Sequence, residues 1–522
     1  MTGDATSTTD LDGTDGTDGT DGTSGTEQSG ARSQRPTSEA FRRFVASGWG
    51  PRPEVDATPG DGPRRAVRRR ERLSAQFPGD RLVVPAGGLQ VRSNDTDHRF
   101  RPHTAFAYLT GLGGDTEPDC VLVLEPRDDG AGSGEGGGHD AVLYFRPRAG
   151  RDTEEFYADA RYGELWVGVR PSLAEVAQVT GIEARHLDEL HDAVAKDLGH
   201  LVVRVVRDAD PSVTDALDTA RHTADVDDEE ARRLDDALAD AVSAQRCVKD
   251  DWEVEQLREA VAATVRGFED VARALPRAVG HARGERVVEG VFTARAREEG
   301  NGVGYDVIAA AGAHACTLHW IRNDGAVAAD DLVLVDAGVE ADSLYTADVT
   351  RTLPVSGRFS EPQRRVYQAV LDAADAAFAV VRPGATIRDV HAAAMGVLAD
   401  RLADWGLLPV TAEESLDPER GGQHRRWMVH GTSHHLGLDV HDCARLRRET
   451  YQGQALEPGM VFTIEPGLYF RPDDLLVPEE LRGIGVRIED DVLVTADGYE
   501  NLSAALPRDP DAVEAWLEAV RS

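Results

Sequence analysis

Lysine is nearly absent from this chain of 522 residues. Only Lys196 and Lys249 are present, so arginine supplies nearly all of the positive charge. Acidic residues outnumber lysine and arginine by 93 to 57, which gives a formal net charge of -36. Such a surface repels the phosphates of nucleic acids and of anionic lipids, so neither is an expected partner.

Cysteine and long apolar runs are also scarce. The four cysteines lie far apart and show no Cys-x-x-Cys spacing: Cys120, Cys247, Cys316 and Cys443. This usage is typical of free, buried thiols in a reducing compartment. No stretch of about 18 apolar residues is present, and the N-terminus lacks the order of charges and apolar residues that marks a secretory signal. We therefore expect a cytoplasmic protein with no membrane partner.

The remaining composition is typical of a globular protein, with 41% hydrophobic and 29% charged residues. A chain of this length is expected to form more than one hydrophobic core. Residues 1–36 are an exception, because they repeat Asp-Gly-Thr and hold almost no apolar side chain. They are predicted to be a disordered tail. A calcium-binding repeat is the alternative, but a period of three residues without a closing glutamate disfavours it.

Residues 37–245 alternate short strands and helices. The apolar runs at 119–126 and 139–147 predict strands, and a Gly-rich loop joins them. Residues 172–181 and 188–199 predict helices, each with a glycine at its end. This alternation predicts a small α/β domain, and no catalytic cluster is evident in it.

Residues 246–522 contain two similar segments, each with two helices joined by a Pro/Gly turn and followed by a strand-like stretch with histidines. The first segment begins at Asp250 and Glu253, whose spacing predicts a capping box, so a domain boundary is placed at about 245. Thr386 and Asp389 predict a second capping box. The repeat predicts a pseudo-symmetric α+β domain.

Residues 331–355 predict two strands joined by a turn. A turn centred on Asp342 would place Asp336 opposite Asp348, with the side chains about 5 Å apart. Carboxylates this close repel each other unless a proton or a cation lies between them. Solvated acids on an outer face are the alternative, but the apolar strand before Asp336 favours burial.

Two more strands carry acids within apolar sequence. Glu465 ends one strand, directly before Pro466. Arg487 and Glu489 are predicted on the same face of another strand. A local arginine often satisfies one buried acid, whereas a divalent cation can serve several acids at once. Four such acids beside a histidine cluster therefore favour a metal site.

That cluster lies in residues 428–442, where four of the 16 histidines occur: His430, His434, His435 and His441. The ordered motifs resemble those of the pita-bread metallopeptidases, most closely the aminopeptidase P (Xaa-Pro aminopeptidase) family. The motifs are VDAGVEADSLYTADVTRT, HGTSHHLGLDVHD, TIEPGLY and GIGVRIEDD. The resemblance covers about residues 37–522. It implies a C-terminal pita-bread (creatinase/aminopeptidase) catalytic domain with a pseudo-twofold repeat, preceded by a smaller creatinase-type α/β domain.

The resemblance also implies two divalent metal ions per chain. Asp336 would bind one ion, Asp348 and Glu489 would bridge both, and His434 and Glu465 would complete the other. Oxygen-rich ligands with a single imidazole suit Mn²⁺ or a similar ion. The turn between the two aspartates is one residue longer than in familiar members of the family.

Three histidines match substrate-binding or catalytic positions of the family. His430 would face the substrate, and His441 would contact the scissile carbonyl or its neighbour. His319, in CTLHW, would bind the substrate or assist the leaving amine. His435 has no counterpart role and is interpreted as structural.

Three further residues have implied roles beside the ligands. Glu465 would act as a general base as well as a ligand. Tyr469 would line the proline pocket. Arg487 would contribute to substrate binding and orient the carboxylate of Glu489.

The implied reaction is hydrolysis of the N-terminal Xaa-Pro bond of peptides by a hydroxide that bridges both metal ions. Prolidase, which cleaves Xaa-Pro dipeptides, is the main alternative. The segment AFAYLTGL at residues 105–112 resembles an aminopeptidase P segment and favours longer peptides. A catalytically dead peptide-binding module is disfavoured because all five ligand positions are filled. A homo-oligomer, either a dimer or a tetramer, is also expected.

Overall fold

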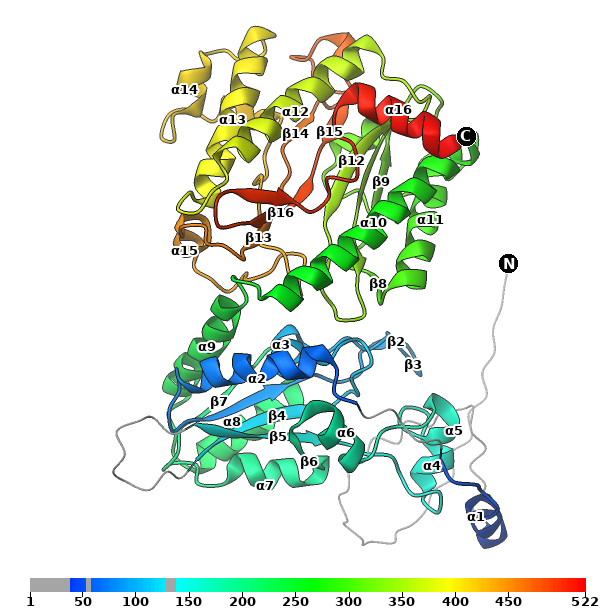
Figure 1. Ribbon diagram of the computed structural model, residues 1–522, viewed down its shortest axis with the longest axis vertical. Coiled ribbons are helices and arrows are strands. Elements are labelled where there is room, and N and C mark those ends of the chain that lie inside the picture. Colours follow the sequence, from blue (N-terminus) through cyan, green and yellow to red (C-terminus); the bar gives the residue numbers. More distant parts are fainter. Residues whose placement is uncertain (1–37, 53–57, 128–137) are drawn as a thin grey trace, which may run out of the picture. The chain divides into compact units, whose positions relative to one another are not determined.

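The computed structural model describes residues 38–52, 58–127 and 138–522 (Figure 1). The tail predicted at residues 1–36 lies outside the described residues. The described chain divides into two compact units. One holds residues 38–50 and 149–167, and the other holds the rest.

The smaller unit consists of α1 (Glu39–Ala46), α4 (Glu154–Ala158) and α5 (Glu164–Val167). Aromatic side chains join its two segments. Phe41 packs edge-on against Tyr157 with ring centroids 5.2 Å apart, and Trp49 packs against Phe156 at 5.5 Å. These contacts form a local apolar cluster around the buried ring of Phe156.

The larger unit begins with a five-stranded mixed sheet in the order β6-β5-β4-β1-β7. Its strands are β1 (Arg81–Pro85), β4 (Val121–Pro126), β5 (His139–Phe145), β6 (Glu183–His186) and β7 (Val203–Val205). β4 pairs antiparallel with β1 and β5, whereas β7 and β6 add to the two edges in parallel. The strands predicted at 119–126 and 139–147 are thus confirmed as β4 and β5. A short hairpin of β2 (Val91–Ser93) and β3 (Thr96–Asp97) follows β1.

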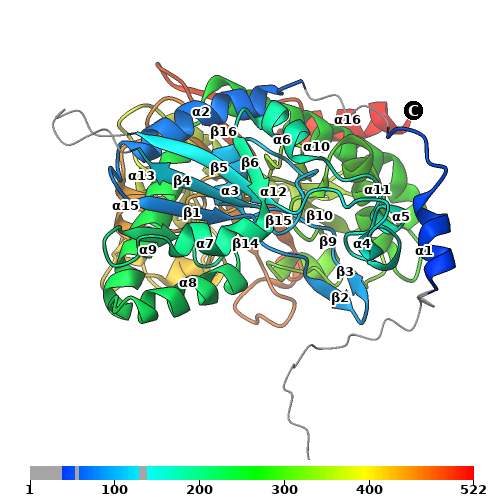
Figure 2. The same cartoon turned by 90° about the horizontal axis from the view of Figure 1, so that it is seen from below.

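Helices cover both faces of this sheet, which explains why its strands are apolar on both sides. Leu82 and Leu122 point into a core shared with α2 (Asp61–Ser74), α3 (Thr104–Thr110) and α9 (Asp228–Gln245). Their neighbours Val83 and Val123 point into a second core with α7 (Leu190–Ala195) and α8 (Pro211–Thr223). Figure 1 shows the strands of this sheet between α2 and α7, and Figure 2 shows the same sheet from below.

The two helices predicted in this region are both present. The first is α6 (Leu173–Thr180), which begins in a capping box at Ser172 and ends at Gly181 in the left-handed region. The second, α7, is shorter than predicted and is preceded by a 3-10 turn at Leu187–Glu189.

Two antiparallel helix pairs dominate the C-terminal half (Figure 1). They are α10 (Asp251–Ala278) with α11 (Gly284–Glu299), and α12 (Glu361–Val380) with α13 (Ile387–Asp404). Both predicted capping boxes are present, at the starts of α10 and α13. The shorter helices of this half are α14 (Ala412–Leu416), α15 (Arg448–Gly453) and α16 (Pro510–Arg521). Within the described ranges, no helix is long and apolar enough to cross a bilayer.

The aspartate strands form a hairpin whose register differs from the prediction. β10 (Leu332–Ala337) pairs with β12 (Val349–Pro354) and β9 (Ile308–Ala311), and Asp336 lies opposite Thr350, not Asp348. The turn is centred one residue later than expected, because Leu344 adopts a positive φ of 72° and the Ala341 N–H donates to the Tyr345 carbonyl. Asp348 still lies on the face of Asp336, since residues two apart in a strand share a face.

β11 (Val339–Glu340), which continues this hairpin after Gly338, pairs with β8 (Gly302–Val303). It connects the aspartate strands to the turn.

The single strand predicted around Arg487 and Glu489 is two strands. β13 (Val461–Ile464) pairs with β16 (Asp490–Val494), whereas β14 (Gly467–Tyr469) pairs with β15 (Gly485–Arg487). β17 (Tyr499–Asn501) pairs antiparallel with the other edge of β16. The break falls at Pro466, which has no N–H to donate to a ladder. The register is the same on both sides of the break, so Glu465 faces Glu489 across it.

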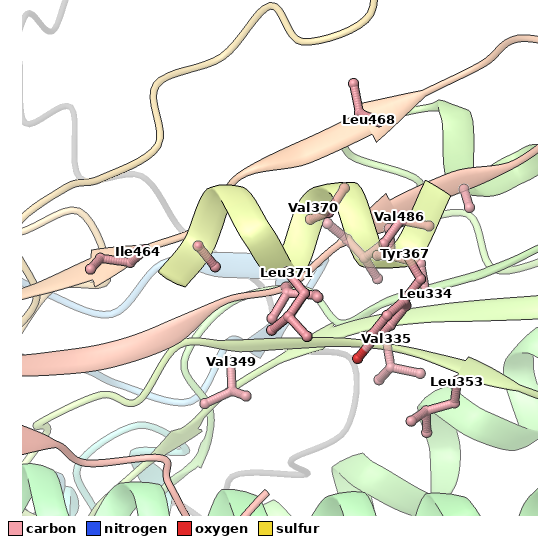
Figure 3. Close-up of a cluster of buried hydrophobic side chains, with 14 of the residues drawn as sticks. Leu334, Val335, Val349, Leu353, Tyr367, Val370, Leu371, Ile464, Leu468 and Val486 are labelled. Carbon is pink, nitrogen blue, oxygen red and sulfur yellow. The ribbon is translucent and has the colours of Figure 1, made fainter. Parts of the chain in front are cut away.

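Helix α12 packs against β13, β14 and β15. Figure 3 shows Val370 and Leu371 of α12 near the strand residues Leu334, Val335 and Val486, all of which belong to the main hydrophobic core. Val335 and Val486 each directly precede a polar site residue in their strands, so Asp336 and Arg487 point to the opposite face.

Candidate active site

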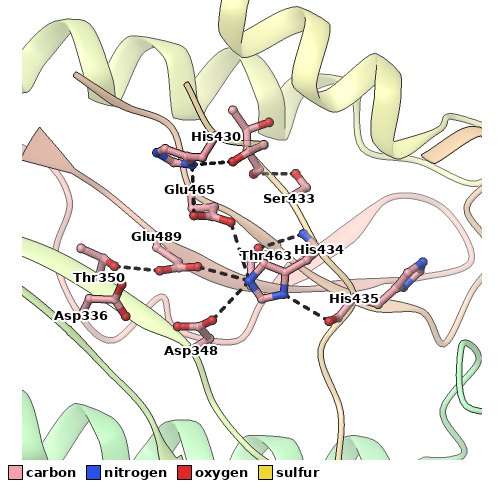
Figure 4. A network of polar contacts seen from close by, with 12 residues as sticks. Asp336, Asp348, Thr350, His430, Ser433, His434, His435, Thr463, Glu465 and Glu489 are labelled. Atoms are coloured by element: carbon pink, nitrogen blue, oxygen red, sulfur yellow. Dashed lines mark hydrogen bonds and ion pairs between the residues drawn. The ribbon is translucent and has the colours of Figure 1, made fainter. Parts of the chain in front are cut away.

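The five predicted metal ligands converge on the inner side of these strands (Figure 4). They come from β10, from the residue before β12, from the segment that bridges to β13 beside His435, and from the two breaks in the second strand pair: Asp336, Asp348, His434, Glu465 and Glu489. Asp348, Glu465 and Glu489 stand at strand ends or breaks, where a side chain is free to turn inward.

His434 is the centre of this group. Its Nε2 atom lies 3.3 Å from Oδ2 of Asp348, 3.6 Å from Oε1 of Glu465 and 3.9 Å from Oε1 of Glu489. One ligand atom from each of Asp348, His434 and Glu489 lies within 4.8 Å of the others. These separations allow one cation to contact several of the side chains.

Asp336 joins the group through Tyr305, which the sequence did not point to. The Tyr305 hydroxyl donates to Oδ1 of Asp336 at 2.8 Å and also contacts Asp348. Tyr305 stands outside any strand, and its partners lie 31 and 43 residues away. Contacts between residues so distant leave no periodic signal in the sequence.

Arg487 binds a different carboxylate from the one predicted. Its guanidinium donates to Asp336, to the Thr350 hydroxyl at 3.1 Å and to the Tyr469 hydroxyl at 3.1 Å. Glu489 accepts its hydrogen bond from the Thr350 hydroxyl at 2.7 Å. Thr350, and not Arg487 as predicted, therefore orients the carboxylate of Glu489. Thr350 lies opposite Asp336 in the strand register.

His430 is held as a neutral ring by two hydrogen bonds. Nδ1 lies 2.6 Å from the Gly431 carbonyl oxygen, so it carries the proton and donates. Nε2 therefore accepts from the Tyr469 hydroxyl at 2.7 Å. Burial, with the nearby Arg487 cation, lowers the pKa of His430 to about 3. The ring thus presents an uncharged face beside the carboxylates.

The other predicted histidines differ in position. The ring of His441 stands edge-on to that of His434 with centroids 4.5 Å apart. His319 is exposed. Burial lowers the pKa values of His430 and His441, and His319 adds to both shifts, so it lies near both rings. His435 points away from the predicted ligands and packs edge-on against Tyr451, in keeping with a structural role.

The site holds more negative groups than positive ones. Burial and neighbouring carboxylates raise the pKa of Glu465 to about 7 and raise the pKa values of Asp336 and Glu489. Burial alone would lower the pKa of His434, but Asp348 and Glu465 raise it to about 9. Three buried carboxylates and the half-buried Glu465 thus share Arg487 and one imidazole, and this donor set fits divalent cations.

Comparison with known proteins matches both halves of the chain. The model of metallopeptidase family M24 matches residues 255–496, and the model of the aminopeptidase P N-terminal domain matches residues 66–203. Xaa-Pro aminopeptidase 1 of Streptomyces coelicolor is 52% identical over 484 residues, which are 93% of either chain. This chain belongs to the aminopeptidase P family of metallopeptidases.

Other members of the family show the same relationship. Xaa-Pro aminopeptidase 2 of Streptomyces coelicolor is 51% identical over 92% of this chain and 96% of its own. A substrate complex of an Escherichia coli aminopeptidase P variant superposes with a TM-score of 0.75 at 30% identity, covering 88% of this chain and 99% of that one. The predicted fold class, with a pita-bread domain after an aminopeptidase P N-terminal domain, is confirmed.

Proposed function

We propose that this protein is a metal-dependent aminopeptidase that removes the first residue from peptides with proline at the second position. The observation that carries the proposal is the convergence of Asp336, Asp348, His434, Glu465 and Glu489 beside three further histidines. Relatives 52% and 51% identical along nearly the whole chain are named Xaa-Pro aminopeptidases.

The five ligands are proposed to hold two divalent cations, with Mn²⁺ the ion that best suits their oxygens and single imidazole. Asp336 lies outside the tight group of Asp348, His434 and Glu489 and is tied to Asp348 by Tyr305, which supports two positions instead of one. Such cations supply Lewis acidity, which activates water and stabilises charge on a carbonyl oxygen.

The chain's own groups would complete the reaction. Glu465 would take a proton from the attacking water and deliver it to the departing prolyl nitrogen. His319 and His441 would hold the scissile carbonyl and its neighbours. Free carboxylate oxygens at the same place would bind the N-terminal ammonium of the peptide.

The preference for proline would come from His430, Tyr469 and Arg487. These three form one hydrogen-bonded series, so the uncharged ring of His430 has no free nitrogen to offer to a peptide N–H. A prolyl nitrogen has no proton and loses nothing there, whereas another residue would bury an unpaired donor.

The sequence-based division into domains stays part of the proposal. A boundary near residue 245 is supported by the end of α9 at Gln245 and the capping box that starts α10. A cytoplasmic location is supported by four free, buried cysteines. A homo-oligomer remains a prediction from the family resemblance.

The test is hydrolysis of Ala-Pro-Ala, Ala-Ala-Ala and Ala-Pro by protein loaded with Mn²⁺, with metal content measured on the same samples. Release of alanine from Ala-Pro-Ala alone, at two ions per chain, is the expected result. Equal cleavage of Ala-Ala-Ala would end the proline assignment. Faster cleavage of Ala-Pro would identify a prolidase, and no cleavage with a full metal complement would indicate a peptide-binding module.

A further inference from the structure

The segment that carries His441 is held from outside the catalytic half. Among the described residues, the imidazole of His441 has no hydrogen bond, so its position depends on the backbone of residues 436–442. We propose that Arg101 and Thr104, from the N-terminal α/β sheet region, are positioning residues that fix His441 relative to Asp348. This inference rests on the proposed function and adds residues from another part of the chain to the site.

Arg101 binds two segments of the catalytic half at once. Its Nε donates to Oε2 of Glu340 at 2.6 Å, and one of its terminal nitrogens donates to the Leu438 carbonyl at 2.6 Å. Glu340 belongs to the hairpin that carries both aspartates, and Leu438 lies three residues before His441. A planar guanidinium has several N–H groups that point in different directions, so it can donate to both segments at once. A lysine ammonium is a compact point charge and cannot reproduce this geometry.

The place where Arg101 binds is the junction of those two segments. Glu340 pairs with Thr346 across the hairpin, and the Thr346 N–H donates to the Gly437 carbonyl at 2.9 Å. Arg101 therefore spans a backbone contact that already joins the aspartate hairpin to the histidine segment. The carboxylate of Glu340 is almost fully buried, and a buried charge-assisted bond is stronger than a surface one.

Thr104 adds a second tie to the same segment. Its hydroxyl donates to Oδ1 of Asp439 at 2.5 Å and accepts from Arg101 at 3.3 Å. Thr104 is the first residue of α3, and all side chains of this helix are buried. The hydrogen bond to Asp439 therefore comes from a well-packed helix. On the far side of His441, Asp442 is bound by Arg246 at 2.9 Å and by Lys249 at 3.5 Å.

The first experiment compares Arg101→Met with Arg99→Met. Arg99 also reaches the catalytic half, donating to the Asn301 carbonyl at 2.8 Å, but it does not touch the histidine segment. Arg101→Met is expected to lower kcat for Ala-Pro-Ala on the order of ten- to a hundredfold with little change in KM, because His441 is left mispositioned. Arg99→Met should match the wild type. Metal content should stay at the wild-type level in both, because Arg101 contacts none of the five ligands.

Thr104→Val removes the hydroxyl without changing the shape of the side chain, so it carries the test if Arg101→Met fails to fold. The kcat of Thr104→Val for Ala-Pro-Ala should also be lower than that of the wild type. A further readout is rescue: ethylguanidinium added to Arg101→Ala should restore part of kcat, whereas a merely structural loss would not respond.

Folded Arg101→Met and Thr104→Val proteins with wild-type kcat would overturn the inference. So would a kcat loss that follows a loss of bound metal, or one that ethylguanidinium leaves unchanged. A wild-type protein that holds metal and cleaves no Xaa-Pro peptide would overturn the proposed function itself, which is a separate outcome of the same assay.

Discussion

The hydroxyl of Tyr305 donates to Asp336 at 2.8 Å and also contacts Asp348, so one phenol joins the two aspartates of the hairpin. Tyr305→Phe removes this donor and leaves the ring in place. The two carboxylates should then lose their relative orientation and bind metal more weakly, by about 10- to 100-fold as is typical for groups that orient ligands. Titration calorimetry of metal-stripped protein with Mn²⁺ measures the change.

Tyr367→Phe is the matched control for that variant. Tyr367 is also fully buried, but its hydroxyl has no hydrogen-bond partner within the part of the chain that the structure describes. Its loss should therefore leave Mn²⁺ affinity unchanged. Equal affinities in the wild type and in Tyr305→Phe would show that the phenol does not orient the aspartates.

Replacing Asp348 with alanine should reduce activity by several orders of magnitude. Asp348 contacts His434 and lies in the tightest part of the ligand group, so its loss removes a ligand that the proposal shares between two ions. The fold should survive, because removing one of several mutually repelling buried carboxylates relieves charge repulsion.

The control is Asp342→Ala, which changes an exposed aspartate in the turn of the same hairpin. Turnover of Ala-Pro-Ala and metal content should both be normal in it. Full activity in Asp348→Ala would remove this residue from the metal site.

The stabilisation that metal gives should depend on pH. The pKa of Glu465 is raised from 4.5 to about 7, and those of Asp336 and Glu489 are raised in the same direction. The folded metal-free protein thus holds protons that the unfolded chain has already lost. Its free energy of unfolding therefore falls as pH rises from about 4.5 through 7.

Metal binding follows the opposite trend, because the ligands must be ionised to bind it. The increase in Tm on adding Mn²⁺ should therefore be larger at about pH 8 than at about pH 5.5. Calorimetric scans of chelator-treated and reloaded protein at both pH values provide the test. An equal increase at both would mean that the raised carboxyl pKa values do not govern metal binding.

Tyr469→Phe should separate substrate binding from metal binding. The Tyr469 hydroxyl accepts from Arg487 and donates to Nε2 of His430, so its removal frees the ring of His430 to rotate. KM for Ala-Pro-Ala should rise several-fold, whereas Mn²⁺ affinity should stay constant, because the phenol touches no ligand. An unchanged KM together with weaker metal binding would contradict this division of roles.

The acidic residues that converge on His434 could be found from sequence because each acid interrupts a stretch that is otherwise apolar. Glu465 was identifiable for this reason, and Pro466 beside it marked the break that the structure shows. The capping boxes at Asp250 and Thr386 were equally local and were confirmed. Features carried by two or three neighbouring residues were therefore predictable.

Features that depend on tertiary contacts could not be predicted from the sequence. The hairpin register was wrong because Leu344 takes a left-handed conformation that leucine rarely adopts, so nothing in the sequence moved the turn. Closeness in sequence predicts a pairing of Arg487 with Glu489, whereas the carboxylate that Arg487 binds, Asp336, is 151 residues away. No local sequence pattern predicts the roles of Tyr305 and Arg101, because their partners are distant in sequence. The partners of Arg101 lie in the catalytic half of the chain.

The enclosure of Lys249 has a practical consequence for chemical labelling. Lys249 is 1% exposed beside Asp442, whereas Lys196, at the end of α7, is 69% exposed. An amine-reactive dye or resin should therefore modify Lys196 and spare Lys249 in the folded protein. Coupling of lysine side chains to a surface would then run through Lys196 alone, with the segment around His441 left chemically intact.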